Sequence, residues 1–188
     1  MEKKLIVLLL LLFVSPLSQA KGFFNNTILG LAYINQTAEI EVSGTGPTIT
    51  RQSESGTGFS IYLDKYYNRS FRLSTALSYV SYINFDLGQL TIATDYLIPV
   101  SEEISFFGGL SLGAVTQKYA NANLTETSLG SVYGAQAGVI IYLNKYLMLE
   151  GGYRYRPASI ETEITGTTGA ISTVTDLSES YFSLLFMF

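Results

Sequence analysis

The sequence predicts an all-β fold: an eight-stranded antiparallel up-and-down transmembrane β-barrel, preceded by a cleaved signal peptide. Three features support this: an apolar leader at the N-terminus, period-two alternation in eight later segments, and a C-terminus that ends in alternating apolar residues. Successive side chains of a strand point to opposite faces, so such alternation gives each strand one apolar and one polar face.

The first twenty residues have the pattern of a secretory signal peptide. Two lysines are followed by ten consecutive apolar residues, 5–14, and then by a proline and small residues that end at Ala20. A helix needs about 20 apolar residues to span a membrane, so this run is too short to do so. We therefore expect a signal peptide at 1–20 and one outer-membrane barrel domain at 21–188.

The composition suits a membrane protein built from strands. The chain is 47% hydrophobic, and after the leader no apolar run approaches the length of a membrane-spanning helix. Only helices and closed barrels satisfy all their backbone groups in lipid. The chain has no cysteine, so disulfides do not hold the fold together. The expected mature chain carries 9 basic and 14 acidic residues without a basic patch, which argues against nucleic acid as a partner.

Eight segments carry the alternation, and each has one bulky row and one row of small, polar or charged residues. They are 29–34, 59–64, 71–79, 90–98, 105–113, 133–143, 147–156 and 179–188. A transmembrane barrel turns its bulky rows outward to lipid and its polar rows inward. A soluble barrel with a charged exterior and an apolar lumen is the alternative that this pattern leaves open.

The expected connections alternate between short and long. Short turns are predicted near 64–68, 99–103 and 144–146, a further short one at 83–88, and long polar loops near 42–57, 119–129 and 158–175. The motif IYLDKY ending at Tyr66 recurs as IYLNKY ending at Tyr146, which predicts two equivalent turns at Asp-Lys and Asn-Lys. Short turns at one end and long loops at the other are typical of outer-membrane barrels.

The C-terminus reads YFSLLFMF, and alternate residues of this stretch form one apolar row. The row consists of Phe182, Leu184, Phe186 and Phe188. In this respect the chain resembles bacterial outer-membrane barrel proteins, which end in phenylalanine with apolar residues at alternating positions. In that group the ending is a signal read by the barrel-assembly machinery, so the resemblance implies the same role for these four residues.

Together with the leader, the missing cysteines and the eight segments, this ending resembles the small eight-stranded barrel family typified by OmpX, Ail and the N-terminal barrel of OmpA. The stretch 131–155, SVYGAQAGVIIYLNKYLMLEGGYRY, is the most similar to the family's sixth and seventh strands. No peptidoglycan-binding domain is expected after the barrel, unlike in full-length OmpA. The resemblance implies a bacterial outer-membrane location reached through the periplasm, contacts with outer-membrane lipid and lipopolysaccharide, and a monomer.

Charged residues recur in the rows expected to face inward. They are Arg72, Asp95, Glu150, Arg154, Arg156 and Glu179. We expect Arg72 and Asp95 at similar heights on neighbouring strands, and likewise Arg154 and Glu179. Side chains just fill the interior of an eight-stranded barrel, and buried charges there must pair. We favour a packed polar plug that closes the lumen. An ion path through the barrel and a catalytic carboxylate are the two functional alternatives.

The residue inventory argues against an enzyme and against metal or cofactor sites. The chain has neither histidine nor cysteine, which removes the usual general base and the ligands of zinc. A calcium site at Glu161, Glu163 and Asp176 is conceivable, but a solvated acidic rim is favoured.

Three functions therefore compete. The first is a non-enzymatic barrel that stabilises the outer membrane or presents loops to a surface partner, as in adhesion and resistance proteins. The second is a narrow porin-like channel, and the third is a lipid-modifying enzyme.

Overall fold

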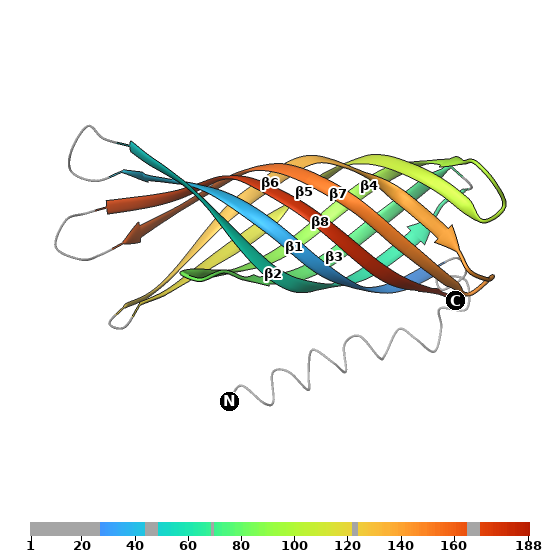
Figure 1. Ribbon diagram of the computed structural model, residues 1–188, viewed down its shortest axis with the longest axis horizontal. Coiled ribbons are helices and arrows are strands. Elements are labelled where there is room, and N and C mark those ends of the chain that lie inside the picture. Colours follow the sequence, from blue (N-terminus) through green and yellow to red (C-terminus); the bar gives the residue numbers. More distant parts are fainter. Residues whose placement is uncertain (1–26, 44–48, 69, 122–123, 165–169) are drawn as a thin grey trace, which may run out of the picture.

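The chain forms one closed barrel of eight antiparallel strands, in which each strand pairs with the next (Figure 1). The computed structural model describes residues 27–43, 49–68, 70–121, 124–164 and 170–188. The strands are β1 (Thr27–Ser43), β2 (Ile49–Tyr66), β3 (Phe71–Ser81), β4 (Phe85–Pro99), β5 (Ile104–Asn121), β6 (Leu124–Tyr142), β7 (Leu147–Ile164) and β8 (Ala170–Met187). This confirms the predicted fold class. The predicted signal peptide, 1–20, lies outside the described residues.

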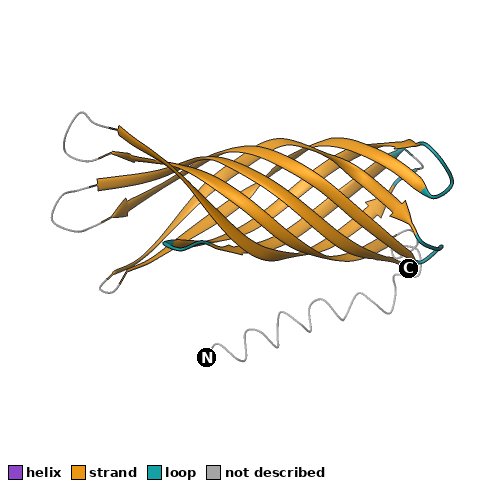
Figure 2. Ribbon diagram, viewed as in Figure 1, coloured by secondary structure: helices purple, strands orange, loops and turns teal. Residues whose placement is uncertain are grey.

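The described part of the chain is built from strands and short connections (Figure 2). Within it, no helix is long and apolar enough to cross a membrane.

The barrel closes between the first and last strands. β1 pairs with β8 from Ile28 opposite Met187 to Ser43 opposite Ile171. In addition, the backbone N–H of Phe188 donates to the carbonyl oxygen of Thr27 at 2.9 Å. The end of the chain is therefore tied into the sheet, and closure gives every strand two partners.

The alternation seen in the sequence becomes an outward apolar face and an inward face of small, polar and apolar residues. The bulky rows are exposed, as for Leu31 at 58% and Phe59 at 71%, whereas the alternate residues Ala32 and Ser60 are buried. A soluble barrel would place charged side chains on the outside and apolar ones within. Here the bulky apolar rows face outward instead, so the soluble alternative does not fit this structure.

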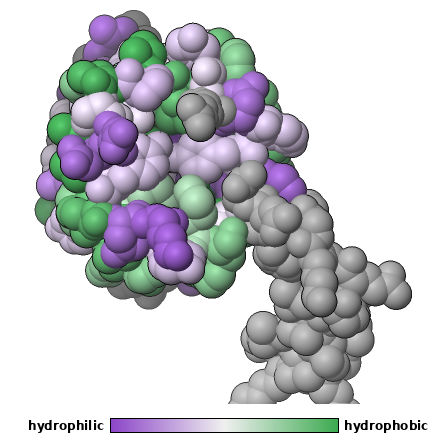
Figure 3. Space-filling model, turned by 90° about the vertical axis from the view of Figure 1, so that its right-hand side faces the viewer, coloured by the Kyte–Doolittle hydropathy of each residue, from purple (hydrophilic) through white to green (hydrophobic). Residues whose placement is uncertain are grey.

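Three short turns lie at one end of the barrel, next to the C-terminus (Figure 1). Seen from that end, hydrophilic and hydrophobic residues are mixed on the surface (Figure 3). In each turn one polar oxygen accepts two backbone N–H groups, those two and three residues later. Asn68 accepts from Ser70 and Phe71 at 2.7 and 2.8 Å, and Ser101 and Asn144 do the same in the other two turns. These side-chain acceptors fix the turns.

The predicted equivalence of the two IYL-D/N-KY motifs is wrong in one respect. Asn144 lies in its turn, but Asp64 and Lys65 belong to β2, which continues to Tyr66. The turn after β2 is built on Asn68 instead. Asp64 consequently points into the barrel, where it is 2% exposed.

The predicted long loops are also wrong over most of their length. β1 and β2 remain paired up to Ser43 opposite Ile49, and β7 and β8 up to Ile164 opposite Ala170. Across the β1–β2 ladder, Arg51 donates to Glu41 at 2.7 Å. Favourable cross-strand pairs keep these polar segments in strands, although their composition resembles that of loops.

Pro157 lies inside β7 rather than in a connection or at a strand end. The β7–β8 register shifts between Pro157 and Ile160, and the β1–β8 register shifts between Glu39 and Ile40. A proline lacks the N–H of a regular ladder, so an irregularity is where a strand can hold one. Pro99 ends β4, and Pro47 lies outside the described residues.

Candidate functional site

The six inward charged residues predicted from the sequence come from four strands and are all buried. Arg72 lies on β3, Asp95 on β4, Glu179 on β8, and the other three, Glu150, Arg154 and Arg156, on β7. Each is at most 4% exposed. Inside a barrel of this size, such groups must find their partners among the other side chains of the interior.

One group of ion pairs surrounds a single guanidinium, and we call it the Arg72 cluster: Arg72, Asp64, Asp95 and Glu150. Arg72 is directly opposite Asp95 in the β3–β4 register. Its Nε and Nη2 donate to Asp95 Oδ2 at 3.0 and 2.8 Å, and its Nη1 donates to Glu150 Oε2. The same Nη1 is 3.5 Å from Asp64 Oδ2. One cation thus faces three carboxylates.

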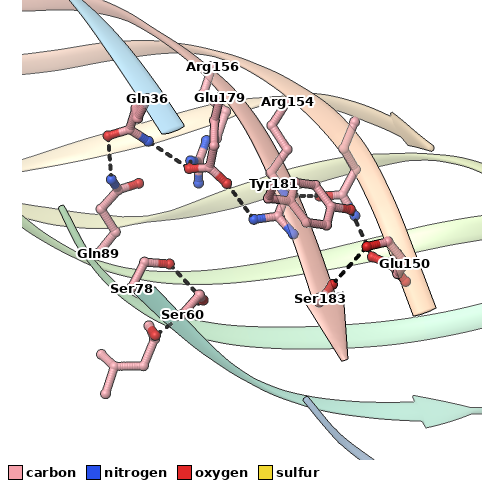
Figure 4. Close-up of polar contacts among 12 residues, drawn as sticks. Gln36, Ser60, Ser78, Gln89, Glu150, Arg154, Arg156, Glu179, Tyr181 and Ser183 are labelled. Atoms are coloured by element: carbon pink, nitrogen blue, oxygen red, sulfur yellow. Dashed lines mark hydrogen bonds and ion pairs between the residues drawn. The ribbon is translucent and has the colours of Figure 1, made fainter. Parts of the chain in front are cut away.

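The second group surrounds a single carboxylate, and we call it the Glu179 cluster: Glu179, Arg154, Arg156 and Gln36. Arg154 is directly opposite Glu179 in the β7–β8 register. Arg154 Nη1 donates to Glu179 Oε1 at 2.7 Å, and Arg156 Nη2 donates to Oε2 at 2.6 Å (Figure 4). Gln36 Nε2 also donates to Oε2, at 2.7 Å. Two cations thus share one carboxylate.

Two residues join the clusters into one network. Gln136 donates to Asp95 Oδ1 at 2.6 Å and accepts from Arg154 Nε at 3.0 Å. The hydroxyl of Tyr181 donates to Glu150 Oε1 at 2.8 Å, and its ring centroid is 3.9 Å from the Arg154 guanidinium carbon. An arginine over an aromatic face is a favourable contact. Charges on β3, β4, β7 and β8 are therefore connected across the interior.

Glycines in the inward rows provide the space for these large side chains. A Cβ on Gly152 would lie 2.6 Å from the hydroxyl oxygen of Tyr181, and a Cβ on Gly109 would collide with Asp95 Oδ1. A Cβ on Gly138 would lie 2.6 Å from the ring of Phe107. Small residues next to large ones are how a narrow barrel packs its interior.

Buried apolar side chains pack around the network and toward both ends. Near the short turns they are Ile28, Leu97, Ile140, Met148 and Leu185; toward the other end they include Val80, Leu87, Val115, Val132, Ile160 and Leu177. The polar network therefore lies between two groups of buried apolar side chains.

Sequence reasoning missed several members of the network. The predicted turn near 64–68 includes Asp64, although this residue belongs to the polar row of the segment 59–64. Gln36, Gln136 and Tyr181 are uncharged and were not singled out, yet Gln136 and Tyr181 also lie in the polar rows of their segments. Membership of the inward row is the signal that identifies Asp64, Gln136 and Tyr181, whereas Gln36 lies beyond the alternating segment 29–34.

The four residues of the C-terminal row all face outward. Phe182, Leu184, Phe186 and Phe188 are 36 to 66% exposed. Their role in assembly remains a prediction. Among the described residues, no group of three or more acidic side chains could hold a metal ion. The calcium site considered at Glu161, Glu163 and Asp176 includes Glu163, whose side chain is not among those described.

No protein-family model matches the chain, and a search of curated proteins finds no similar sequence. Solved structures do match. Surface protein A of Neisseria (NspA) has a TM-score of 0.60 at 15% identity, covering 84% of this chain and 97% of its own. Outer membrane protein AlkL has a TM-score of 0.56 at 15% identity, covering 88% and 92%. OprG of Pseudomonas aeruginosa has a TM-score of 0.54 at 13% identity, covering 87% and 97%.

These likenesses concern the fold, because the identities are low. The resemblance predicted from the sequence is confirmed at this level: the chain has the fold of the small eight-stranded outer-membrane barrels.

Proposed function

We propose that this protein is a non-enzymatic integral outer-membrane barrel with a plugged interior. It is exported through the periplasm with the signal peptide 1–20 and matures as the domain 21–188. Its outward apolar rows contact lipid, and its extended hairpins present polar side chains to the cell surface. The solved outer-membrane structures of the same fold, including that of AlkL in lipid bilayers, support this location.

The single observation that carries the proposal is the connected ion network. Arg72 and Glu179, the centres of the two clusters, are 2% and 0% exposed, and the charge of each is directed at buried partners. An ion path would need polar groups that face water. A network whose groups bond to one another favours a plug that stiffens the barrel.

Electrical recording tests the plug against the channel. We expect the refolded mature protein to leave a planar bilayer silent under conditions in which a known porin gives steady single-channel steps. Steady steps from this protein would replace the proposal with the narrow channel. Insertion is checked separately on the same sample, because a folded barrel migrates differently on a gel before and after boiling.

An enzyme acting on lipid is the remaining alternative, and the chain's lack of histidine argues against it. Mass spectra of lipid A from cells with and without the protein test this point. Identical spectra are expected, and a mass shift that depends on the protein would identify an enzyme.

The alternate apolar residues of β8 supply the assembly signal in this proposal, and the barrel-assembly machinery is the partner that reads it. Deleting Phe188 should lower the amount of folded protein in the outer membrane. The same deletion should have a smaller effect on refolding in detergent, where the machinery is absent. Equal losses in both settings would reduce the role of Phe188 to the stability of the barrel.

A further inference from the structure

The outward apolar surface differs in height between two sides of the barrel. β1 presents three apolar residues in a row, Leu29, Leu31 and Tyr33, before Asn35 and Thr37 follow. β2 likewise presents only three, Phe59, Ile61 and Leu63. These two strands pair directly along their length, so together they form one face with a narrow apolar belt.

The opposite side has a much taller belt. β5 is four strands away from β1 around the closed ring of eight, and its outward row runs from Ile104 to Ala114 with only apolar residues and a glycine. With a rise of about 3.3 Å per residue and a tilt of about 40°, this row spans about 25 Å along the barrel axis. Leu29 to Tyr33 spans about 10 Å by the same measures.

An apolar belt of about 25 Å is what outer-membrane barrels present to lipid, so β5 matches and the β1–β2 face does not. Tilting the barrel would move the belt on one side up and on the other side down, but it cannot narrow one side. The short side therefore requires either a thinner bilayer beside it or a polar partner that covers it.

Above the short belt the surface is hollowed and lined by uncharged polar groups. A depression of about 370 Å³ lies among Asn35, Ser55, Thr57 and Ser81, with Ile83 at its rim. Ile83 is 89% exposed. We call this depression the β1–β3 notch.

Two carboxylates beside the notch, those of Glu54 and Asp86, already have hydrogen-bond partners. Glu54 accepts the backbone and side-chain N–H groups of Asn84 at 3.0 and 3.1 Å, and Asp86 accepts the hydroxyl of Ser81 at 2.7 Å. Such surroundings repel phosphate and suit hydroxyl groups, which can both donate and accept.

We infer that the bilayer is thinned beside β1 and β2, and that sugar hydroxyl groups of lipopolysaccharide in the outer leaflet lie in the β1–β3 notch, with its phosphates directed away from it. This rests on the proposed outer-membrane location. An interface with a second copy would have to desolvate these hydroxyl and amide groups, whereas sugar hydroxyls and water keep them hydrogen-bonded.

Spin labels on matched strands test the inference. The chain has no cysteine, so Thr57→Cys on β2 and Leu112→Cys on β5 each carry a single nitroxide. Thr57 lies nine residues from the short-turn end of β2, and Leu112 lies eight from that end of β5. In vesicles with lipopolysaccharide in the outer leaflet, the label at 112 should be accessible to oxygen and the label at 57 to a water-soluble nickel chelate.

Other accessibilities of the two labels would separate a failure of this inference from a failure of the proposed function. If both labels are accessible to oxygen and shielded from nickel, the thinning is absent and only the inference fails. If neither label is accessible to oxygen, the tall belt is not in lipid and the proposed function itself fails. Spin–spin broadening at 57 that disappears on dilution with unlabelled protein would assign the face to a second copy and overturn the inference.

The sugar headgroup is tested by changing the lipid alone. Replacing lipopolysaccharide with phosphatidylcholine should raise the nickel accessibility of the label at 57 and leave the label at 112 unchanged. No change at 57 would remove the glycolipid from the notch. Asn35→Cys on β1 repeats both measurements if the label at 57 disturbs insertion.

Discussion

The two clusters in the barrel interior have central residues of opposite charge. The Arg72 cluster places one cation among three carboxylates, and the Glu179 cluster places one carboxylate between two arginines. In formal charge the first carries an excess of two negative charges and the second an excess of one positive charge. Gln136 and Tyr181, which touch both clusters, therefore connect regions of opposite sign.

Because of this contrast, replacing the central residue of a cluster should lower the stability of the barrel more than replacing one of its surplus residues. Removing a centre leaves like charges that face one another in a buried setting, which is strongly unfavourable. Removing a surplus charge takes away an attraction but also a repulsion. We therefore expect the largest loss of stability when a central residue is replaced and the smallest when a surplus charge is replaced.

Arg72→Met should have the largest effect, because it leaves Asp64, Asp95 and Glu150 without their shared cation. We expect a loss of at least about 3–5 kcal/mol in the free energy of unfolding, as for other buried pairs that lose one partner. Urea titration in detergent, followed by far-UV circular dichroism, measures the loss; the chain has 14 tyrosines and no tryptophan for fluorescence.

The matched control for this variant is Arg51→Met. Arg51 pairs with Glu41 at 2.7 Å, but its side chain is 82% exposed. An exposed pair contributes about 0–1 kcal/mol, so this variant should unfold almost as the parent does. Equal losses for Arg72→Met and Arg51→Met would contradict the buried network as the source of stability.

Glu179→Gln should cost less, about 3 kcal/mol, since it leaves two buried arginines facing each other without their carboxylate. Arg154 keeps Gln136 as an acceptor and the ring of Tyr181 beneath it, which limits the loss. Adding Arg156→Met should restore part of the stability, because it removes one of the two like charges. A double variant whose losses simply add would contradict the repulsion.

Tyr181→Phe tests the connection between the clusters. It removes the hydroxyl that donates to Glu150 and keeps the ring against Arg154. A hydrogen bond to a charged group contributes about 1.5–3 kcal/mol, and we expect a loss at the lower end of this range. Tyr155→Phe is the control, because its hydroxyl donates to Asp176 at 2.6 Å on the exposed surface. Thermal unfolding of the two variants side by side gives the comparison, and an equal shift would exclude a special role for Tyr181.

Much of the barrel could be predicted from the sequence, because a period of two follows from strand geometry alone. The outward rows, the number of strands and the six inward charges all depend on that period. The length of the hairpins could not be predicted in this way. Thr- and Ser-rich segments such as 49–57 have a composition that suits either a loop or a paired strand. Pairing partners distant in sequence decided between the two.

The connections within the network were beyond the reach of local patterns. Glu150 and Arg72 are far apart in the chain, yet they bond across the lumen. Their contact depends on the stagger of the strands around the barrel, on side-chain length and on the space left by glycines such as Gly109 and Gly152. Local alternation carries no information about these quantities.

Asp64→Asn should change the free energy of unfolding least among these variants. Asp64 is one of three carboxylates around Arg72, and its 3.5 Å contact is longer than the 2.8 Å contact of Asp95. Neutralising it removes one attraction to Arg72 and two repulsions from the other carboxylates, so unfolding should change by less than about 1 kcal/mol. Asp95→Asn, which removes the carboxylate that faces Arg72 directly and accepts from Gln136, should cost clearly more in the same urea titration. If Asp64→Asn destabilises the barrel as much as Asp95→Asn does, the longer contact of Asp64 stabilises the barrel as much as the direct contact of Asp95, and the expectation that Asp64 can be neutralised at little cost fails.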